Sequence, residues 1–272
     1  MRTIATILAL ATLAGACSHQ APQPPRVIIV GDSTASAYGP ERYPRMGWGM
    51  VLACGLSAGV TVDNRAVSGR STKSFIDEGH WSRAIAQARP GDVVLIQFGH
   101  NDEKVEDPTR FTQPAGAFTD NLQRFIEEVR ASGASPVLVT PVARRRFVDG
   151  RAADSHGAYD DAVRALAAAT RTPMVDLASD SLAFLQSEGE EGSRRFYLHL
   201  EPADGVAAYP QGVRDDTHFS EHGARAIARL VAKRLATLAT PLRPFVRARA
   251  RALQPGFITR APSCDPVQKV PG

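Results

Sequence analysis

Cysteine is scarce in this 272-residue chain, and aromatic residues make up only 7 % of it. The cysteines at positions 17, 54 and 264 are too few for a disulfide-rich scaffold, and none forms the Cys-x-x-Cys pair typical of structural zinc sites. Neither sign of charge dominates: the chain has 32 Lys and Arg residues and 28 Asp and Glu residues, which gives a net charge of +4. Such a small excess argues against a protein devoted to nucleic acid. With 43 % apolar and 22 % charged residues, the composition is that of a globular chain and excludes a multi-span membrane protein.

The N-terminal segment has the pattern of an export signal. Arg2 is its only charge, and the apolar run over residues 4–11 is too short to span a bilayer. We therefore expect a signal peptide over residues 1–16 and an exported protein. Small residues before Cys17 resemble a bacterial lipoprotein signal, in which Cys17 is lipidated and anchors a periplasmic or outer-membrane protein; ordinary cleavage and secretion is the alternative. Residues 18–25 (SHQAPQPP) are expected to be a linker.

The body of the chain, residues 26–240, alternates short apolar runs with amphipathic segments. The expected strands are 26–31, 60–67, 92–99, 136–141 and 174–177. The expected helices are 48–56, 81–88, 118–131, 159–170, 182–188 and 220–238. This alternation predicts an α/β fold with a five-stranded parallel sheet covered on both faces. Such a sheet binds its ligand at the carboxyl ends of its strands.

Polar residues follow three of these strands and precede the last helix. Ser33 follows the first strand in Gly-Asp-Ser-Thr, Gly69 follows the second in Ser-Gly-Arg-Ser, and Asn101 follows the third in Gly-His-Asn-Asp. Asp215 and His218 lie in Asp-Asp-Thr-His before the final helix. Together these residues supply a nucleophile, oxyanion donors, a base and an orienting acid, which are the parts of an acyl-transfer site.

The longer strings around these residues carry a specific resemblance. They are GDSTAS, GWG, NRAVSGRS, QFGHND, LVTPVARR and DDTHFSEHGA. From about residue 27 to 238 the chain resembles the SGNH (GDSL-type) hydrolase family, in its rhamnogalacturonan acetylesterase branch. The resemblance implies a flavodoxin-like three-layer α/β/α fold. It also implies a serine esterase that removes O-acetyl groups from a polysaccharide or oligosaccharide. The resemblance implies that this reaction needs no cofactor and no metal.

Residue roles follow from the motifs and from the family pattern. Ser33 is expected to be the nucleophile and His218 the general base. A carboxylate three residues before the histidine can fold back toward its ring and hold Nδ1–H, which leaves Nε2 to take the serine proton. Asp215 and Asp216 both qualify on residue type, and the Asp-x-x-His spacing of the family selects Asp215.

Three donors are expected to stabilise the oxyanion. They are the backbone N–H of Ser33, the backbone N–H of Gly69 and the side-chain amide of Asn101. A glycine lets the backbone approach the substrate oxygen closely, and an asparagine amide is a neutral donor. Outside this context, the same residues would be read as ordinary turn residues.

Four further residues are candidates for substrate binding: Arg70, His100, Arg144 and His156. The arginines could meet uronate carboxylates, although solvated surface charge is the alternative. The histidines lack the spacing of a metal site, so no metal is expected. Trp48 and Trp81 could stack on sugar rings, but core positions are the more usual place for them.

Several alternatives stay open at the level of sequence. The same site could serve acetylxylan, a lipid or a thioester, or the fold could belong to a non-catalytic carbohydrate-binding envelope lipoprotein. Cys54 and Cys264 could form a disulfide, or Cys54 could be a buried thiol. Residues 241–272 hold six basic residues against the single Asp265, and we expect a solvated, loosely packed extension.

Overall fold

The computed structural model describes residues 24–254, 256–260 and 262–264. The expected signal peptide, the lipidation candidate Cys17 and most of the expected linker lie outside these residues. Within the described ranges, no helix is both long and apolar enough to cross a membrane.

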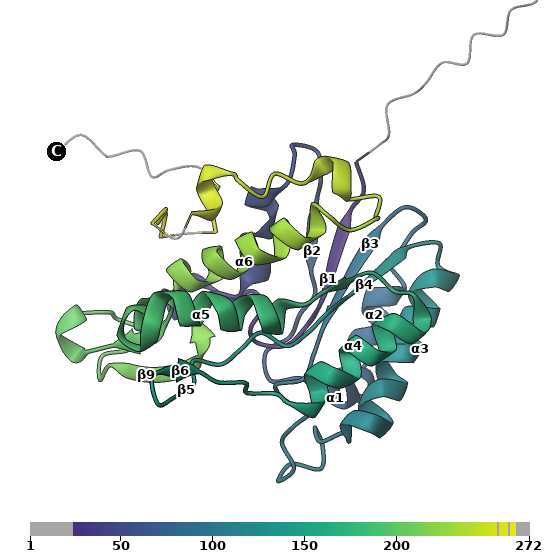
Figure 1. The fold of residues 1–272 in the computed structure, drawn as a ribbon. Helices are drawn as coiled ribbons and strands as arrows, with labels where there is room; N and C mark the ends of the chain where they lie inside the picture. Colours follow the sequence, from purple (N-terminus) through teal and green to yellow (C-terminus); the bar gives the residue numbers. More distant parts are fainter. Residues whose placement is uncertain (1–23, 255, 261, 265–272) are drawn as a thin grey trace, which may run out of the picture.

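Five parallel strands form the central sheet, in the order β2-β1-β3-β4-β7 (Figure 1). They are β1 (Val27–Gly31), β2 (Val62–Asn64), β3 (Val93–Gln97), β4 (Ser135–Val139) and β7 (Met174–Val175). The chain steps to one side from β1 to β2 and then returns to place β3 on the other side of β1. The carboxyl ends of β1 and β3 therefore form a topological switch point, where α/β sheets bind ligands. The prediction of a five-stranded parallel α/β sheet is confirmed.

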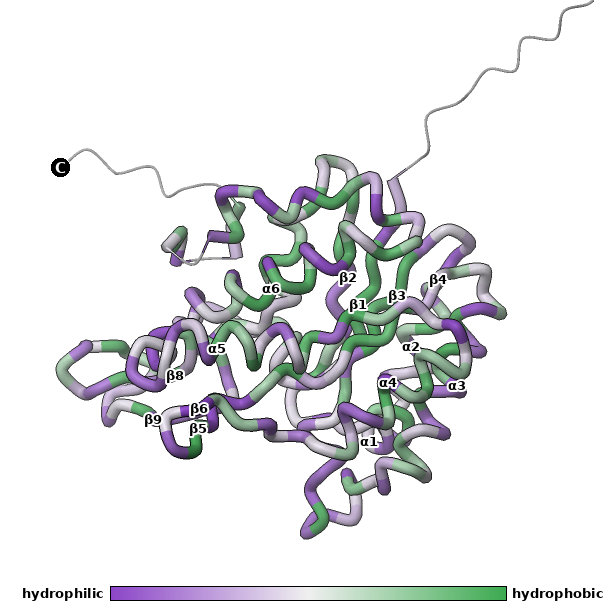
Figure 2. The backbone as a smooth tube through the Cα atoms, in the orientation of Figure 1, coloured by the Kyte–Doolittle hydropathy of each residue, from purple (hydrophilic) through white to green (hydrophobic). Residues whose placement is uncertain are grey.

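Helices cover both faces of this sheet, as Figure 1 shows. One face carries α1 (Thr72–Asp77), α2 (His80–Ile85), α3 (Thr119–Ala131) and α4 (Ala158–Thr170). The other carries α5 (Leu177–Ser193) and α6 (Glu221–Leu235). Strands β1 and β3 are almost entirely apolar (Figure 2), because alternate residues enter opposite cores: in β1, Val27 and Ile29 face α6, whereas Ile28 and Val30 face α1–α4.

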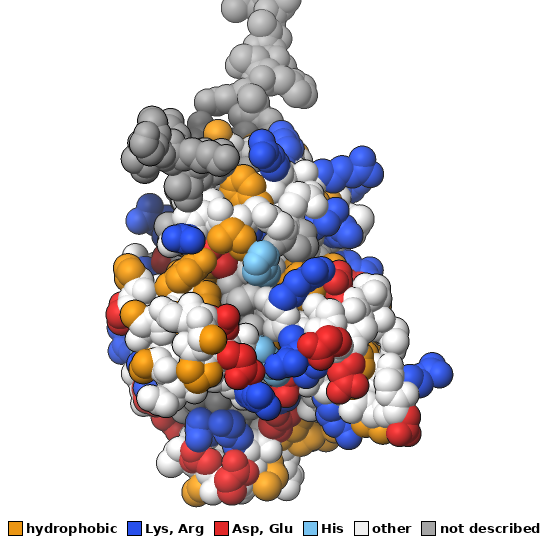
Figure 3. Space-filling view, turned by 90° about the vertical axis from the view of Figure 1, so that its left-hand side faces the viewer, with side chains coloured by type: hydrophobic (Ala, Val, Ile, Leu, Met, Phe, Trp, Pro, Cys, Tyr) orange, Lys and Arg blue, Asp and Glu red, His pale blue; other side chains and the backbone are white. Residues whose placement is uncertain are grey.

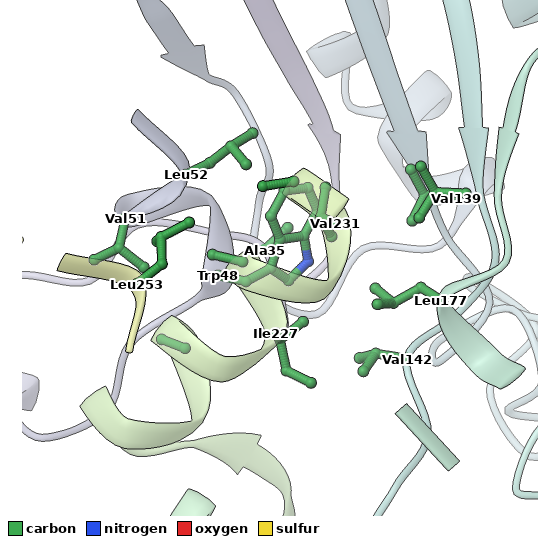
Figure 4. Packing of buried hydrophobic residues seen from close by; sticks show 14 of the residues in the cluster. Ala35, Trp48, Val51, Leu52, Val139, Val142, Leu177, Ile227, Val231 and Leu253 are labelled. Atoms are coloured by element: carbon green, nitrogen blue, oxygen red, sulfur yellow. The ribbon is translucent and has the colours of Figure 1, made fainter. Parts of the chain in front are cut away.

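Both tryptophans belong to these cores. Trp48 packs among apolar residues beside α6 (Figure 4), and its indole N–H donates to Gln97 Oε1 at 2.6 Å. Trp81 stacks on Phe125 with ring centroids 3.9 Å apart and donates to Glu128 Oε2 at 2.6 Å. Both are at most 1 % exposed, so neither can stack on a sugar.

The sequence was less informative about the short elements. The expected helix over residues 48–56 consists of two 3₁₀ turns, η2 (Trp48–Met50) and η3 (Leu52–Gly55). Helix α1 and two hairpins were not expected: β5 (Phe147–Val148) with β6 (Arg151–Ala152), and β8 (Tyr197–Leu200) with β9 (Val213–Phe219). The remaining short segments are η1 (Pro40–Arg42), η4 (Pro114–Phe118), η5 (Arg194–Phe196), η6 (Pro202–Asp204), η7 (Arg243–Phe245) and η8 (Arg251–Leu253).

The expectation of a loosely packed C-terminal extension is wrong for its described part. Leu242 and Leu253 are fully buried in the core beside α6. Arg225 of α6 is also fully buried, and it donates to the Ala252 carbonyl at 2.6 Å. A disulfide joins Cys264 to Cys54, which answers the open question about these cysteines. A buried cation and a few apolar side chains thus hold a segment whose composition alone indicated solvation.

Candidate active site

Ser33 lies in a tight turn directly after β1. The Asp32 carbonyl accepts hydrogen bonds from the N–H groups of Ala35 and Ser36, and the Ser33 carbonyl accepts one from the Tyr38 hydroxyl at 2.7 Å. The turn therefore fixes the main chain on both sides of Ser33. The side chain of Ser33 reaches a cavity of about 260 Å³ at the carboxyl ends of β1 and β3.

The Gly-Trp-Gly string supports this turn from behind. The backbone N–H of Trp48 donates a hydrogen bond to the Thr34 carbonyl at 2.9 Å. Gly47 lies so close that a Cβ there would be 2.2 Å from the Ser36 carbonyl oxygen. Only glycine allows this approach without displacing the turn that carries Ser33.

Asp215 and His218 lie in an irregular part of β9. Leu198 pairs with Asp215 and its neighbour Tyr197 pairs with Phe219, so three residues of β9 bulge out of the hairpin. Within the bulge, Asp215 Oδ1 accepts the N–H groups of Thr217 at 2.8 Å and His218 at 3.0 Å. The bulge folds the carboxylate back toward the imidazole three residues later.

The three side chains form a continuous chain of hydrogen bonds. His218 Nε2 lies 2.9 Å from Ser33 Oγ, and His218 Nδ1 lies 2.7 Å from Asp215 Oδ2. Burial opposes ionisation of Asp215, but hydrogen bonds from His218 and Thr217 outweigh it and lower the pKa of Asp215 below its ordinary value. Because a carboxylate only accepts, Nδ1 carries the hydrogen in the neutral ring and Nε2 is left to accept the serine proton.

Asp216 faces a different set of partners. Its Oδ1 lies 2.7 Å from His199 Nε2 and 3.1 Å from Arg145 Nη1. The structure therefore places Asp215 against His218 and places Asp216 on the outer side of the hairpin.

The expected oxyanion donors lie around the same cavity. Gly69 has φ +80°, and no heavy atom apart from its chain neighbours lies within 4 Å of the position that a Cβ would occupy, so this side of the residue is open. Asn101 is 4 % exposed, and its amide is held at both ends: Nδ2 donates to the Arg70 carbonyl at 3.1 Å and Oδ1 accepts from Arg110 Nη1 at 3.3 Å. Both residues line the cavity together with Ser33 and His218.

The four substrate-binding candidates divide into two pairs. His100 and Arg144 line the cavity. The Arg70 guanidinium turns to Glu78 at 2.7 Å, and His156 is buried between Glu103 Oε2 at 2.9 Å and a backbone carbonyl. Neither the Arg70 nor the His156 side chain lines the cavity. His156 is connected to it indirectly, because Glu103 is a partner of both His156 and the cavity residue Arg144.

His100 is buried beneath the cavity against Asp32. Its Nδ1 lies 3.2 Å from Asp32 Oδ2, and its Nε2 has no hydrogen-bond partner among the described residues. Burial lowers the pKa of His100 to about 4 despite the nearby Asp32 carboxylate, so the ring is neutral at pH 7. The described residues contain no group of three or more His, Cys, Asp or Glu that could hold a metal ion.

Positive charge surrounds the cavity, a feature that motif analysis missed. Arg45, Lys104 and Arg110 line it in addition to Arg144. Figure 3 shows histidine side chains on one face of the molecule with Lys, Arg and acidic side chains around them. These cations come from loops without a periodic pattern, so the sequence offered no signal that would group them.

A second serine occurs in a string typical of a different hydrolase fold. Gly55-Leu56-Ser57-Ala58-Gly59 matches the G-x-S-x-G pattern of α/β-hydrolases. Ser57 lies before β2, at the opposite edge of the sheet from Ser33, and its hydroxyl donates to the Phe245 carbonyl at 3.0 Å. Its surroundings are therefore those of a structural serine.

A serine, histidine and aspartate in hydrogen-bond contact at this edge of a five-stranded parallel sheet define a serine hydrolase with a flavodoxin-like fold. The family model of the GDSL-like lipase/acylhydrolases matches residues 29–226. This chain belongs to that family.

Two curated relatives from Bacillus subtilis align with most of the chain. Rhamnogalacturonan acetylesterase RhgT is 40 % identical over 84 % of this chain and 96 % of its own length. The probable rhamnogalacturonan acetylesterase YesY is 35 % identical over 79 % of this chain and 94 % of its own length. Among solved structures, protein YxiM of the same organism superposes with a TM-score of 0.66 at 27 % identity, over 78 % of this chain and 56 % of its own.

Proposed function

We propose that this protein is a serine esterase that removes O-acetyl groups from carbohydrate, with rhamnogalacturonan as the polymer. The observation that carries the proposal is the chain of hydrogen bonds from Ser33 Oγ to His218 at 2.9 Å and on to Asp215 at 2.7 Å, beside a polar cavity. The names of the two curated relatives support the choice of polymer.

The reaction begins at Ser33. His218 Nε2 takes the proton of the Ser33 hydroxyl as Oγ attacks the acetyl carbonyl carbon, while Asp215 holds the charged ring in place. The backbone N–H groups of Ser33 and Gly69 and the amide of Asn101 donate to the oxygen that becomes negative.

The second half of the reaction uses the same residues. His218 gives its proton to the sugar oxygen as the C–O bond breaks, which releases the sugar hydroxyl and leaves an acetyl group on Ser33. A water molecule then loses a proton to His218 and attacks the acetyl-enzyme, and the products are acetic acid and free Ser33.

The lining of the cavity favours a short acyl group. Its described lining is glycine and polar or charged side chains, with no Val, Leu, Ile, Met or Phe. A longer acyl chain gains about 0.8 kcal/mol per methylene only where it can be buried against apolar surface. An acetyl group needs no such surface, so selectivity must come from contacts to the alcohol part of the substrate.

Acetate release from matched polymers tests this proposal. Acetylated rhamnogalacturonan, acetylxylan and 4-nitrophenyl esters of increasing chain length are compared with the wild-type protein and with Ser33→Ala. We expect the highest kcat/KM on acetylated rhamnogalacturonan, a steep fall from 4-nitrophenyl acetate to butyrate, and no turnover by Ser33→Ala. Faster turnover of the octanoate ester would favour a lipase, and faster turnover of acetylxylan would change the polymer.

We also propose that the protein is exported and anchored to a membrane through a lipidated Cys17, on the strength of the apolar N-terminal run and the small residues before Cys17. The wild-type protein should then partition with membranes, whereas Cys17→Ser should be released or remain unprocessed. A wild-type protein found only in the soluble fraction, cleaved at another residue, would indicate plain secretion.

A further inference from the structure

A second cavity of about 360 Å³ lies next to the one at Ser33. Its volume falls within the range of about 300–1,000 Å³ that is usual for small-molecule sites. Aromatic, thioether and proline side chains form its walls, and two arginines complete them. The lining residues are Tyr38, Gly39, Pro40, Tyr43, Arg45, Met46, Met50, Arg260 and Pro262.

Two residues connect this second cavity to the site of the reaction. Arg45 lines both cavities. Tyr38 lines the second cavity and donates its hydroxyl hydrogen to the Ser33 carbonyl at 2.7 Å. A ligand that spans both cavities would therefore pass over Arg45 while its ester lies at Ser33.

The two arginines of the second cavity have no carboxylate partner among the described residues. Arg45 Nη2 donates to the Tyr38 hydroxyl at 3.1 Å and its guanidinium lies 4.5 Å from the centroid of the Tyr38 ring, while its buried Nε has no hydrogen-bond partner in the described part of the chain. The backbone N–H of Arg260 donates a hydrogen bond to Glu221 Oε2 at 3.0 Å, but the Arg260 side chain forms no ion pair with a carboxylate of the described residues.

Carboxylates close to the second cavity do not remove this excess of positive charge. Glu221 is buried and engaged by Arg225 at 2.7 Å. Glu41 is exposed and lies against Gly39, but it does not line the cavity. The cavity thus offers aromatic and apolar surface together with two guanidinium groups that lack anionic partners.

We propose that this second cavity is a subsite for an acidic sugar, a uronate residue of the same polymer chain as the sugar whose acetyl ester lies at Ser33. Tyrosine rings and methionine side chains suit the apolar faces of a pyranose ring. Guanidinium groups suit its carboxylate, because they can donate two parallel hydrogen bonds to it. The inference rests on the proposed function and adds the feature of the polymer that the enzyme recognises.

The wall that carries Arg260 is held in place by the C-terminal segment. Glu221 Oε1 accepts the Thr259 N–H at 2.8 Å, and the disulfide between Cys54 and Cys264 fixes the chain four residues beyond Arg260. The segment that composition presented as a basic extension thus forms part of the subsite. This placement explains why a basic residue of the tail lies next to a site built from the N-terminal third of the chain.

The test is calorimetric binding of unacetylated rhamnogalacturonan oligosaccharide to the Ser33→Ala protein, in two forms: with free uronate carboxylates and with the carboxyl groups reduced to alcohols. We expect the carboxylate form to bind about tenfold more tightly than the reduced form, because charge-assisted hydrogen bonds to arginine are lost on reduction. Adding Arg260→Gln should reduce this preference, because only Arg45 of the two subsite arginines then remains, and Arg260→Lys should retain more of it. Arg249→Gln is the matched control, since it removes the same charge from an exposed position of the same segment that does not line the cavity.

The outcomes separate the subsite from the proposed function. An unchanged preference in Arg260→Gln, an equal loss in Arg249→Gln, or no preference for the carboxylate form in the parent protein would each overturn the subsite, even if the wild-type enzyme releases acetate from the polymer. An Arg260-dependent preference in a protein that releases no acetate from rhamnogalacturonan would support the subsite and overturn the polymer assignment. Faster hydrolysis of octanoate than of acetate would assign the cavity to an acyl chain and overturn the subsite.

Discussion

Replacing Asp215 with asparagine preserves the shape of the side chain and reverses one hydrogen bond. In the wild-type protein, the Asp215 carboxylate accepts hydrogen bonds from His218 Nδ1 at 2.7 Å and from two backbone N–H groups. An asparagine can keep its oxygen on the two N–H groups, but it then presents its NH₂ donor to Nδ1. The ring must accept there, so its hydrogen moves to Nε2, which faces Ser33 Oγ and can no longer take the serine proton.

The size of the effect follows from this change of tautomer. The corresponding substitution in a well-studied Ser-His-Asp protease lowers kcat by about 10⁴, which is about 5.4 kcal/mol of transition-state stabilisation. We expect a loss of the same order in kcat for 4-nitrophenyl acetate. Asp216→Asn is the matched control, because Asp216 contacts His199 and Arg145 rather than His218. The kcat of Asp216→Asn should stay within about threefold of the wild type, which is a change of less than about 0.7 kcal/mol in the activation free energy.

The assay is initial-rate hydrolysis of 4-nitrophenyl acetate at pH 7, accompanied by urea unfolding of each variant. Unfolding also has an expected pH dependence, because the pKa of Asp215 is lowered in the fold. The stabilisation by charged Asp215 is complete above the unfolded pKa of about 3.9 and is lost as the pH falls through the lower folded pKa; Asp215→Asn should lack this contribution. A folded Asp215→Asn protein that keeps more than a tenth of wild-type kcat, or an Asp216→Asn protein that loses as much as Asp215→Asn, would refute the assignment.

Three further outcomes are expected. Asn101→Ala should lower kcat on 4-nitrophenyl acetate by about 10²–10³, the usual effect of losing one oxyanion donor; a loss below threefold would make Asn101 a structural residue. Glu221→Gln should lower the free energy of unfolding in urea by about 3–5 kcal/mol, because it leaves the fully buried Arg225 without its anion; an unchanged midpoint would contradict this. Because burial lowers the pKa of His100 to about 4, stability attributable to this residue should be complete above the unfolded pKa of about 6.5 and lost as the pH falls toward 4. That part of the pH dependence should be missing in His100→Gln, and identical profiles would argue against a neutral buried ring.

The longest apolar runs were enough to predict the sheet. Strands β1, β3 and β4 are buried on both faces, so nearly every residue in them is apolar and the strand pattern is continuous. Helix α1 was missed because it spans only six residues and depends on a local capping box between Ser71 and Ser74. The hairpin of β8 and β9 was missed because β8 is only four residues long and β9 is mostly half-exposed or exposed and interrupted by a bulge, which breaks any alternating pattern.

The residues gathered around Ser33 were largely foreseeable for a topological reason. Ser33, Gly69 and Asn101 each follow a parallel strand, and parallel strands deliver such residues to one edge of the sheet. Arg45 and Arg260 could not be grouped in this way, because they lie in a loop and in the C-terminal segment. Their proximity depends on a disulfide that closes a separation of 210 residues and on a buried ion pair, and neither leaves a local pattern in the sequence.

Fluorophosphonate labelling followed by peptide mass spectrometry tests the central claim most directly, because the reagent bonds only to a serine oxygen that has been activated as a nucleophile. We expect one labelled serine, Ser33, with labelling abolished in His218→Ala and complete loss of esterase activity on labelling. Ser57, in the competing Gly-x-Ser-x-Gly string, should remain unmodified. A label on Ser57 or on any other serine, or an active enzyme whose Ser33 never reacts, would contradict the account.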